Sequence, residues 1–554
     1  MDFATPLSGL KSLTYRQPAL PAAHLDLVNL LLPLYNNTTA APDPTVILDH
    51  ALPLFTLGQT DARWESSCVA MTVISSLVSA TSLYHEGPRA PSADGLHPIP
   101  SPAPLPPNLP PTLVEFFLPQ IPTLLSHAEP RVRTLTSTLI SALTSLHPTM
   151  YSLLYPGIIS QITDTYKNRI VDGAVDDTTG WRNLETSLHC LASLILTISD
   201  YTTETYDDAA KPYLVESDIE ILEHCAVDHV NRHVRAASLL TYDTILKTIS
   251  SPTDPTLLPT HFLHKSILRV LSSRLSDNWS QVRMSASVLT RTLLLTLPPA
   301  THPAVWSAIL PSMCLNRHYL ADGVKQFSIA TWQQIISKDV GLGLVATHIG
   351  GVVVHYLRTL DVDNHVIRES ACDAVLEVRG GGGEAQRGEA GERLAKSDWP
   401  IARGAMMHVP LVPPFPCSQP VASQLSSSLS SSEQHKGALL PHIPLLLNGL
   451  TVCFFDESWP VRDRAGVAVG RFITAYPGEC RAFVDSVMYE RFVEQIKDPI
   501  WSVRSNGAVG LANIARCYED YRERVKGLFG EMLPLAASEA VRTAKDKKDE
   551  ANNK

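Results

Sequence analysis

An apolar helical pattern follows the same short signature several times along this chain. The signature is a polar turn, an apolar β-branched residue and a basic residue, and the apolar positions after it recur at the spacing of one helix face. Six copies end on an arginine, namely Arg133, Arg235, Arg283, Arg368, Arg462 and Arg504, and a seventh ends on Lys325. Each copy therefore predicts a turn followed by a helix that buries one face.

The signatures recur at a nearly constant interval. From Arg235 to Arg368 successive copies lie 48, 42 and 43 residues apart, and the last pair, Arg462 and Arg504, lies 42 residues apart. These intervals match a repeating unit of about 40 to 47 residues that contains two helices. The 102 residues between Arg133 and Arg235 have room for two units. The sequence therefore predicts an all-α superhelix of about nine to ten helical hairpins.

A second regularity accompanies the basic residues. Three positions later, about one helical turn onward on the same face, the chain places a small residue that lets a neighbouring helix approach closely. In chain order these residues are Thr136, Ser238, Ala286, Ser328, Ala371, Ala465 and Gly507. The regularity indicates packing between successive repeats.

Three of the turns carry an aspartate before the signature, at Asp277, Asp456 and Asp498. With this aspartate and the following Val-Arg, the pattern resembles the HEAT repeats over residues 114–378 and 437–537. The resemblance implies that the aspartates and the six signature arginines form a ladder between neighbouring repeats. An acidic residue at the turn also suits the N–H groups at the start of the second helix. HEAT-type folds serve many unrelated functions, so the resemblance predicts architecture rather than activity.

Two segments interrupt the repeats and set the predicted domain boundaries. The first is rich in proline and the second in glycine, proline and serine, compositions typical of loops and linkers. We expect an N-terminal capping repeat (1–85), a proline-rich loop (86–113), HEAT repeats (114–378), a disordered linker (379–436), C-terminal HEAT repeats (437–537) and a charged tail (538–554). The linker predicts two rigid parts, one on each side of it.

Composition narrows the class of partner and the compartment. Apolar residues make up 44% and charged residues 18%, as in folded proteins. The net charge of -10, without a Lys/Arg cluster, argues against nucleic acid, and no apolar run suggests membrane insertion. The nine cysteines contain no CxxC pair and suggest buried free thiols. We expect a cytoplasmic protein, with a nuclear location also open.

One cluster suggests metal chemistry. His224, Cys225, His229 and His233 lie within ten residues and include suitable zinc ligands. The alternative is an ordinary solvated turn, because the repeat pattern places His229 in a turn and His233 near the start of a helix. The HEAT-like deoxyhypusine hydroxylases use several His-Glu dipeptides to bind iron, whereas His85-Glu86 is a single copy.

Recognised catalytic motifs are absent from the sequence. There is no phosphate-binding GxxxxGK[ST] loop, no GxSxG nucleophile elbow and no HExxH helix. The calcium-loop pattern that begins at Asp361 has Val366 where glycine is required and Cys372 where glutamate is required. We therefore predict no catalytic residue, no cofactor and no metal site.

Three tryptophans occupy almost the same place in three turns, at Trp279, Trp459 and Trp501. An aromatic row along one edge would suit protein recognition, and it resembles the turn tryptophan of tubulin-binding TOG arrays. Those arrays have basic turns, whereas these turns are acidic. The alternative is that each indole packs against the adjacent repeat. The signature arginines also allow two interpretations: they could bind an acidic partner, or they could form the structural ladder between repeats.

The predicted function is a non-catalytic protein-binding scaffold or adaptor that uses an extended repeat surface. A phosphatase regulatory subunit, a kinase-assembly co-chaperone and a nuclear transport receptor all fit this prediction. Two alternatives remain open: a TOG-like tubulin binder and a metal-dependent HEAT-like enzyme. The expected partners are proteins.

Overall fold

The computed structural model describes several residues between 52 and 75, and then residues 115–146, 149–171, 174–175, 180–199, 216–249, 260–296, 303–336, 338–378 and 431–531. The expected proline-rich loop (86–113), most of the linker and the charged tail lie outside these residues. The chain divides into two compact units, Met1–Ile309 and Leu310–Lys554. Each unit is described by itself.

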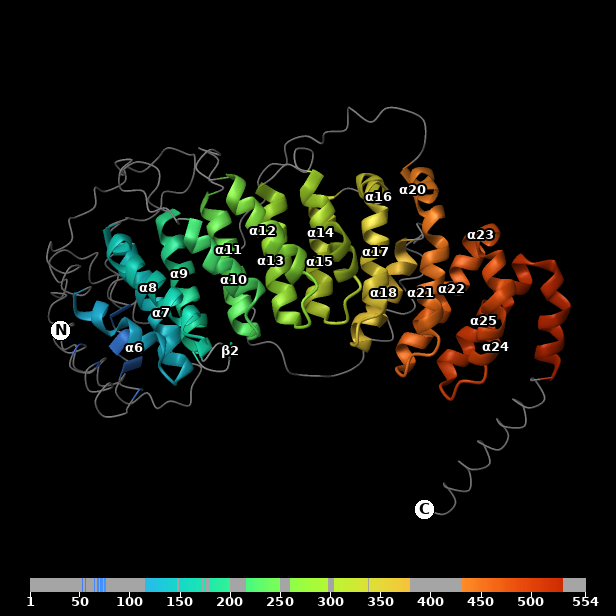
Figure 1. Ribbon diagram of the computed structural model, residues 1–554, viewed down its shortest axis with the longest axis horizontal. Helices are drawn as coiled ribbons and strands as arrows, with labels where there is room; N and C mark the ends of the chain where they lie inside the picture. The colour runs from blue at the N-terminus through green and yellow to red at the C-terminus, as the bar shows by residue number, and fades with distance from the viewer. Residues whose placement is uncertain are drawn as a thin grey trace, which may run out of the picture. The chain divides into compact units, whose positions relative to one another are not determined.

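Unit 1 is a stack of helical pairs whose helices stand side by side (Figure 1). The second helices of the pairs pack in a row in the order α7, α9, α11, α13. The first helices of the same pairs are α6, α8, α10 and α12, and each packs against the second helix that follows it. The bounds are η1 (Leu118–Gln120), α6 (Ile121–Leu125), α7 (Pro130–Leu146), α8 (Thr149–Lys167), α9 (Trp181–Ser199), α10 (Glu216–Val227), α11 (Arg232–Ile249), α12 (Thr260–Arg274) and α13 (Ser280–Thr296). A short antiparallel hairpin of β1 (Ile170–Val171) and β2 (Ala174–Val175) lies between α8 and α9.

Unit 2 continues the helical pairs, and the unit boundary falls inside α14 (Pro303–Asn316). Its second helices α18, α22 and α25 pack in a row, and α17 packs against α21. The bounds are α15 (Asp322–Ile335), α16 (Lys338–Thr347), α17 (Ile349–Leu360), α18 (His365–Val378), α20 (Ser431–Leu439), η5 (Leu440–His442), α21 (Ile443–Cys453), α22 (Trp459–Ala475), α23 (Pro477–Phe483), the π-helical η6 (Val484–Met488), α24 (Tyr489–Gln495), α25 (Trp501–Cys517) and η7 (Glu519–Tyr521). Residues 522–531 are also helical.

The sequence signature explains why these helices pack. The apolar residue before each basic position is buried, from Val132 and Val234 in unit 1 to Val461 and Val503 in unit 2. The small residues three positions after the basic residue are buried as well. A Cβ built on Gly507 would lie 2.9 Å from Cβ of Gln495 in α24, the first helix of the same pair. The buried positions and the row of packed second helices confirm the predicted all-α, HEAT-type solenoid. Among the helices of the described ranges, none is long and apolar enough to cross a membrane.

The linker does not separate two rigid parts in the way the sequence suggested. α20 begins at Ser431, inside the segment assigned to the linker, and α22 packs directly on α18. The buried His435 of α20 also places its Nε2 2.5 Å from the carbonyl oxygen of Val378. A long connection can be inserted at small entropic cost without disturbing the stack. The division into units falls instead at Ile309 and Leu310.

Candidate functional site

The signature arginines hold the turns of their own repeats closed. In five of the six, Arg283 being the exception, Nη1 donates to carbonyl groups five or six residues earlier in the chain. Arg235 donates to the carbonyls of His229 (2.8 Å) and Val230 (2.5 Å), and Arg462 to those of Asp456 (2.7 Å) and Glu457 (3.1 Å). These bonds satisfy turn carbonyls and fix the guanidinium plane beside the turn.

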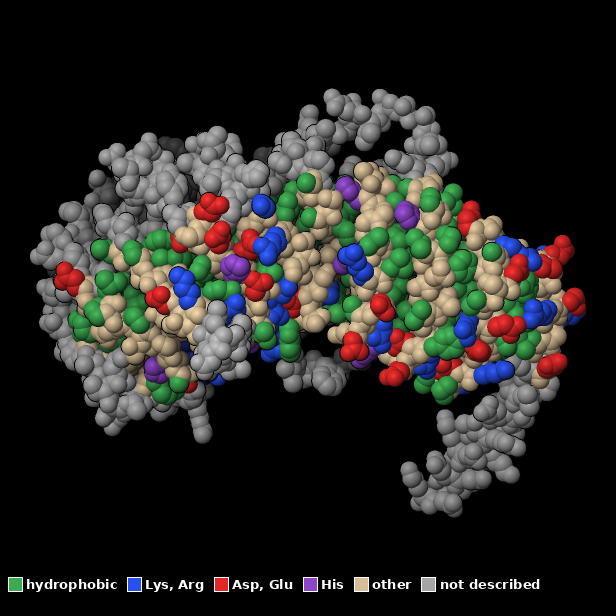
Figure 2. All heavy atoms as spheres, viewed as in Figure 1, with side chains coloured by type: hydrophobic (Ala, Val, Ile, Leu, Met, Phe, Trp, Pro, Cys, Tyr) green, Lys and Arg blue, Asp and Glu red, His purple; other side chains and the backbone are tan. Residues whose placement is uncertain are grey.

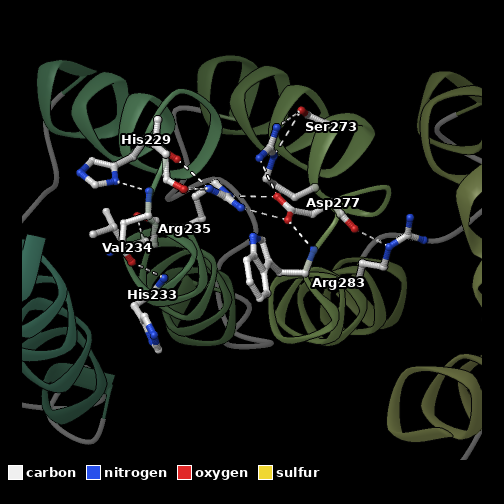
Figure 3. Close-up of polar contacts among 12 residues, drawn as sticks. His229, His233, Val234, Arg235, Ser273, Asp277 and Arg283 are labelled. Atoms are coloured by element: carbon white, nitrogen blue, oxygen red, sulfur yellow. Dashed lines mark hydrogen bonds and ion pairs between the residues drawn. The ribbon is translucent and has the colours of Figure 1, made fainter. Parts of the chain in front are cut away.

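In Arg235, Arg368 and Arg462, the other two nitrogen atoms of the guanidinium group contact the next repeat. Arg235 donates from Nε and Nη2 to the carboxylate of Asp277, at 2.9 and 3.0 Å, as Figure 3 shows. Arg368 contacts Asp456 in the same way, at 2.5 and 3.0 Å, and Arg462 contacts Asp498 at 2.7 and 3.2 Å. The planar fork of arginine matches a carboxylate, so each pair has two parallel hydrogen bonds.

The aspartate of each pair also shapes its own turn. Oδ1 of Asp277 accepts the backbone N–H of Trp279 at 2.9 Å, and Oδ1 of Asp498 accepts that of Ile500 at 2.8 Å. Although burial alone would raise it, hydrogen bonds from Arg462 and Ile500 hold the pKa of Asp498 below its usual value. The carboxylate therefore links two repeats and organises the entry to a helix at once.

Two histidines take the place of the turn aspartate in the first repeats. Nδ1 of His127 accepts the N–H of Glu129 at 3.0 Å, and Nδ1 of His229 accepts that of Asn231 at 3.0 Å. Both stand six residues before a signature arginine, as the aspartates do. In chain order that sixth position holds His127 (before Arg133), His229, Asp277, Tyr319 (before Lys325), Val362, Asp456 and Asp498. That an imidazole can accept the backbone N–H in place of the aspartate was not predicted from the sequence.

Arg133 and Arg283 also bind their own turns. Nη1 of Arg133 donates to the carbonyls of His127 (2.7 Å) and Ala128 (3.1 Å). Nε of Arg283 donates to the carbonyl of Asp277 at 2.5 Å, and its side chain is 1% exposed. Arg274 also contacts the carboxylate that Arg235 binds, and it donates to Asp277 at 2.7 Å. Asp277 thus compensates two buried or half-buried cations.

The turn tryptophans lie at the starts of second helices and remain accessible. About half of Trp279 (49%) and Trp459 (47%) and most of Trp501 (71%) are exposed. Trp459 and Trp501 are the first residues of the neighbouring helices α22 and α25. The ring of Trp279 lies 4.0 Å from the guanidinium carbon of Arg232 in the preceding repeat. These indoles therefore form part of the surface, whereas Arg133, Arg235 and Arg283 are buried.

Each unit has further aromatic rings at the starts of its second helices or in its turns. In unit 1, Trp181 stacks on His233 with ring centres 5.5 Å apart. In unit 2, His365 occupies the first position of α18 and is exposed, and Phe455 is 55% exposed beneath Arg491. Sequence reasoning missed these members because they are not tryptophans at the repeated position.

The histidine and cysteine cluster does not converge on a point. Nδ1 of His224 lies 2.6 Å from Asp228, whereas His233 stacks on Trp181. Cys225 is buried, and so is His229, which corrects the interpretation of this turn as fully solvated. Across the described ranges, no group of three or more histidine, cysteine or acidic side chains is arranged to hold a metal ion.

A half-buried polar cluster in unit 2 has no signature in the sequence. Arg317 and His318 both contact Glu377, at 2.9 and 2.6 Å, and Arg317 lies 4.1 Å above the ring of Trp332. Burial raises the pKa of the neighbouring Cys314 thiol to about 11. A protonated thiol is a poor nucleophile, so this cluster favours a structural role that ties α14 to α18.

Comparison with known proteins gives no family and no curated relative. No family model matches the chain, and no curated protein matches it. Among solved structures, it is similar to importin beta in an ammonium sulfate condition (12% identity, 93% of this chain and 56% of that chain, TM-score 0.37). It is also similar to the karyopherin Kap121p bound to Nup53p (11% identity, 98% and 48%, TM-score 0.38), and to an engineered protein (12% identity, 93% and 99%, TM-score 0.30). The chain thus spans about half the length of these karyopherins.

Proposed function

We propose that this protein is a non-catalytic binding scaffold that recognises protein partners through the turn edge of unit 2. This edge, called here the C-terminal turn edge, consists of His365, Phe455, Trp459, Trp501 and Arg504. The observation that supports the proposal is the exposure of Trp459 and Trp501 at the starts of two adjoining helices.

Exposed indoles at these positions contribute little to the fold and much to a potential interface. An aromatic side chain buries about 150 to 250 Å² when it is covered, and each Å² of apolar area removed from water contributes about 25 cal/mol. Tryptophan and arginine are also the residues most enriched among interface hot spots. Charged side chains of both signs lie over the C-terminal helices in Figure 2, as expected for a polar rim around aromatic anchors.

Replacing both Trp459 and Trp501 with alanine is expected to abolish recovery of the principal protein partner in quantitative affinity purification of the tagged full chain. Because both rings are largely exposed, the thermal midpoint should change little, as for most surface substitutions. Trp279→Ala is the matched control, since it removes an equally exposed turn indole from unit 1. Undiminished recovery with the double variant would count against the proposed edge.

Tubulin binding is a second candidate, favoured by the same exposed tryptophans. The acidic turn residues Asp456, Glu457 and Asp498 weigh against it, because the TOG arrays that these tryptophans resemble have basic turns. Co-sedimentation of the wild-type chain with microtubules, compared with the Trp459/Trp501 double variant, separates this candidate from a scaffold for other proteins. We further propose that the scaffold acts in the cytoplasm, or in the nucleus as well.

A further inference from the structure

Three of the signature arginines, Arg235, Arg368 and Arg462, bind a carboxylate of the next repeat, whereas Arg504 binds none among residues 431–531. Nη1 of Arg504 donates to the carbonyls of Asp498 (2.8 Å) and Pro499 (2.9 Å), just as Arg462 binds its own turn. Within residues 431–531, no acidic side chain contacts Nε or Nη2 of Arg504, and Arg504 is exposed. The same two nitrogen atoms bind aspartate in the Arg235, Arg368 and Arg462 rungs.

The acidic side chains closest in sequence to this end of the stack have other roles. Glu490 pairs with Arg524 at 2.7 Å, and Glu523 lies 3.6 Å from Lys526. Asp498 itself is bound to Arg462. The guanidinium of Arg504 is therefore held in the orientation of a ladder rung while its carboxylate position is open.

The sequence after residue 531 does not repeat the aspartate of the earlier turns. The next Val-Arg pair is Val541 and Arg542, and the sixth position before that arginine holds Ala536. In the three rungs that bind a carboxylate in the next repeat, this sixth position holds Asp277, Asp456 or Asp498. Residues 532–554 therefore do not repeat the aspartate that supplies the carboxylate of the earlier pairs.

Trp501 lies three residues before Arg504 and is the most exposed of the turn tryptophans. Its equivalent in the preceding repeat, Trp459, has a neighbouring repeat beside it and is less exposed. Residues three apart lie on one face of a helix, so Trp501 and Arg504 of α25 offer one hydrophobic contact and one bidentate carboxylate contact. A short peptide segment with an acidic residue next to an apolar residue matches both.

We infer that Arg504 and Trp501 form a docking site for an acidic segment of a partner protein, whose aspartate or glutamate pairs with Arg504 as the turn aspartates pair with the earlier arginines. This inference rests on the proposed scaffold function and names the chemistry of its partner. Three internal rungs show the donor atoms and the carboxylate geometry that the partner would reproduce. The exposed site makes the expected interaction dependent on salt concentration.

The test uses the purified full chain and an array of immobilised 12-residue peptides that vary in acidic and apolar content. Wild-type protein should select peptides with Asp or Glu beside an apolar residue, and Asn or Gln in place of the acid should weaken binding about tenfold or more. Arg504→Glu should abolish selection and Arg504→Lys should weaken it, because lysine retains the charge but lacks the fork. Arg516→Glu is the matched control, an exposed arginine in the last turn of the same helix.

Three results would overturn the inference: selection of peptides without acidic residues, no selection above background, or equal binding by wild-type and Arg504→Glu proteins. A fourth variant, Glu539→Gln with Asp546→Asn, tests the chain's own C-terminal residues as the source of the acid. If this variant and Arg504→Glu lowered the thermal midpoint by the same amount without additivity, the acid would be internal and the inference wrong. If the Trp459/Trp501 variant loses the protein partner but Arg504→Glu does not, the proposed scaffold function is supported. Only the proposal that Arg504 binds an acidic segment is then contradicted.

Discussion

Replacing Asp277 with alanine is expected to lower the free energy of unfolding by about 3 to 5 kcal/mol, the range for removing one partner of a buried ion pair. The carboxylate is 3% exposed and accepts hydrogen bonds from Arg235 and Arg274. Alanine leaves both guanidinium groups near the protein interior without their counter-charge. It also removes the acceptor of the Trp279 N–H, which alone contributes about 1 kcal/mol at a helix start.

Chemical denaturation of the full chain, with amide hydrogen exchange in α11 and α13, measures this effect. Asp277→Asn is expected to fall between alanine and wild type, since an amide oxygen can still accept the Trp279 N–H but carries no charge. Asp520→Ala is the matched control, because Asp520 also binds an arginine through two bonds but at a 56% exposed site. Exposed pairs contribute only about 0 to 1 kcal/mol. Equal losses for Asp277→Ala and Asp520→Ala would contradict the burial argument.

Gly510→Ala is expected to destabilise unit 2 by about 2 kcal/mol or more, although alanine normally favours a helix over glycine by roughly 0.5 to 1 kcal/mol. A Cβ on Gly510 would lie 2.2 Å from Cε1 and 2.4 Å from Cδ1 of Phe492. Phe492 is fully buried and meets the ring of Phe454 edge-on at 5.4 Å. The ring cannot move away without disturbing this second contact.

The control for Gly510 is Gly527→Ala, the same substitution at an exposed position within helical residues 522–531. No atom lies within 4 Å of a Cβ built there, so helix propensity should dominate and the thermal midpoint should rise slightly. Adding Phe492→Leu to Gly510→Ala should recover part of the lost stability. A neutral or stabilising Gly510→Ala would show that α24 and α25 do not approach as closely as described.

The repeat period could be predicted from the sequence because it depends on residue types that recur at fixed positions. A valine, an arginine and a small residue at constant spacing define a buried face, and the resemblance to HEAT repeats implied that turn aspartates pair with these arginines between neighbouring repeats. The Arg235–Asp277, Arg368–Asp456 and Arg462–Asp498 contacts connect residues that this pattern had already singled out.

Features that depend on geometry rather than residue type could not be predicted in the same way. His127 and His229 occupy the aspartate position, but only the bond from Nδ1 to a backbone N–H reveals their equivalence. The exposure of a turn indole depends on where the neighbouring helix begins, so Trp501 could equally have been covered. The cluster of Arg317, His318 and Glu377 joins residues about 60 positions apart without any repeat signal.

The pair formed by Arg368 and Asp456 tests most directly whether an arginine–aspartate ladder joins successive repeats, because 88 residues and the whole expected linker separate the two side chains. The measurement is a double-mutant cycle with Arg368→Ala, Asp456→Ala and the double variant, followed by denaturant unfolding of the full chain. Arg368→Ala also removes the hydrogen bond to the Val362 carbonyl, and Asp456→Ala removes the acceptor of the Ser458 N–H. Each of these effects occurs in a single variant and again in the double variant, so both cancel in the cycle. We predict a coupling energy of about 1.5 kcal/mol or more, within the range for residues in direct contact. Additive single effects, with coupling below about 0.5 kcal/mol, would contradict the ladder.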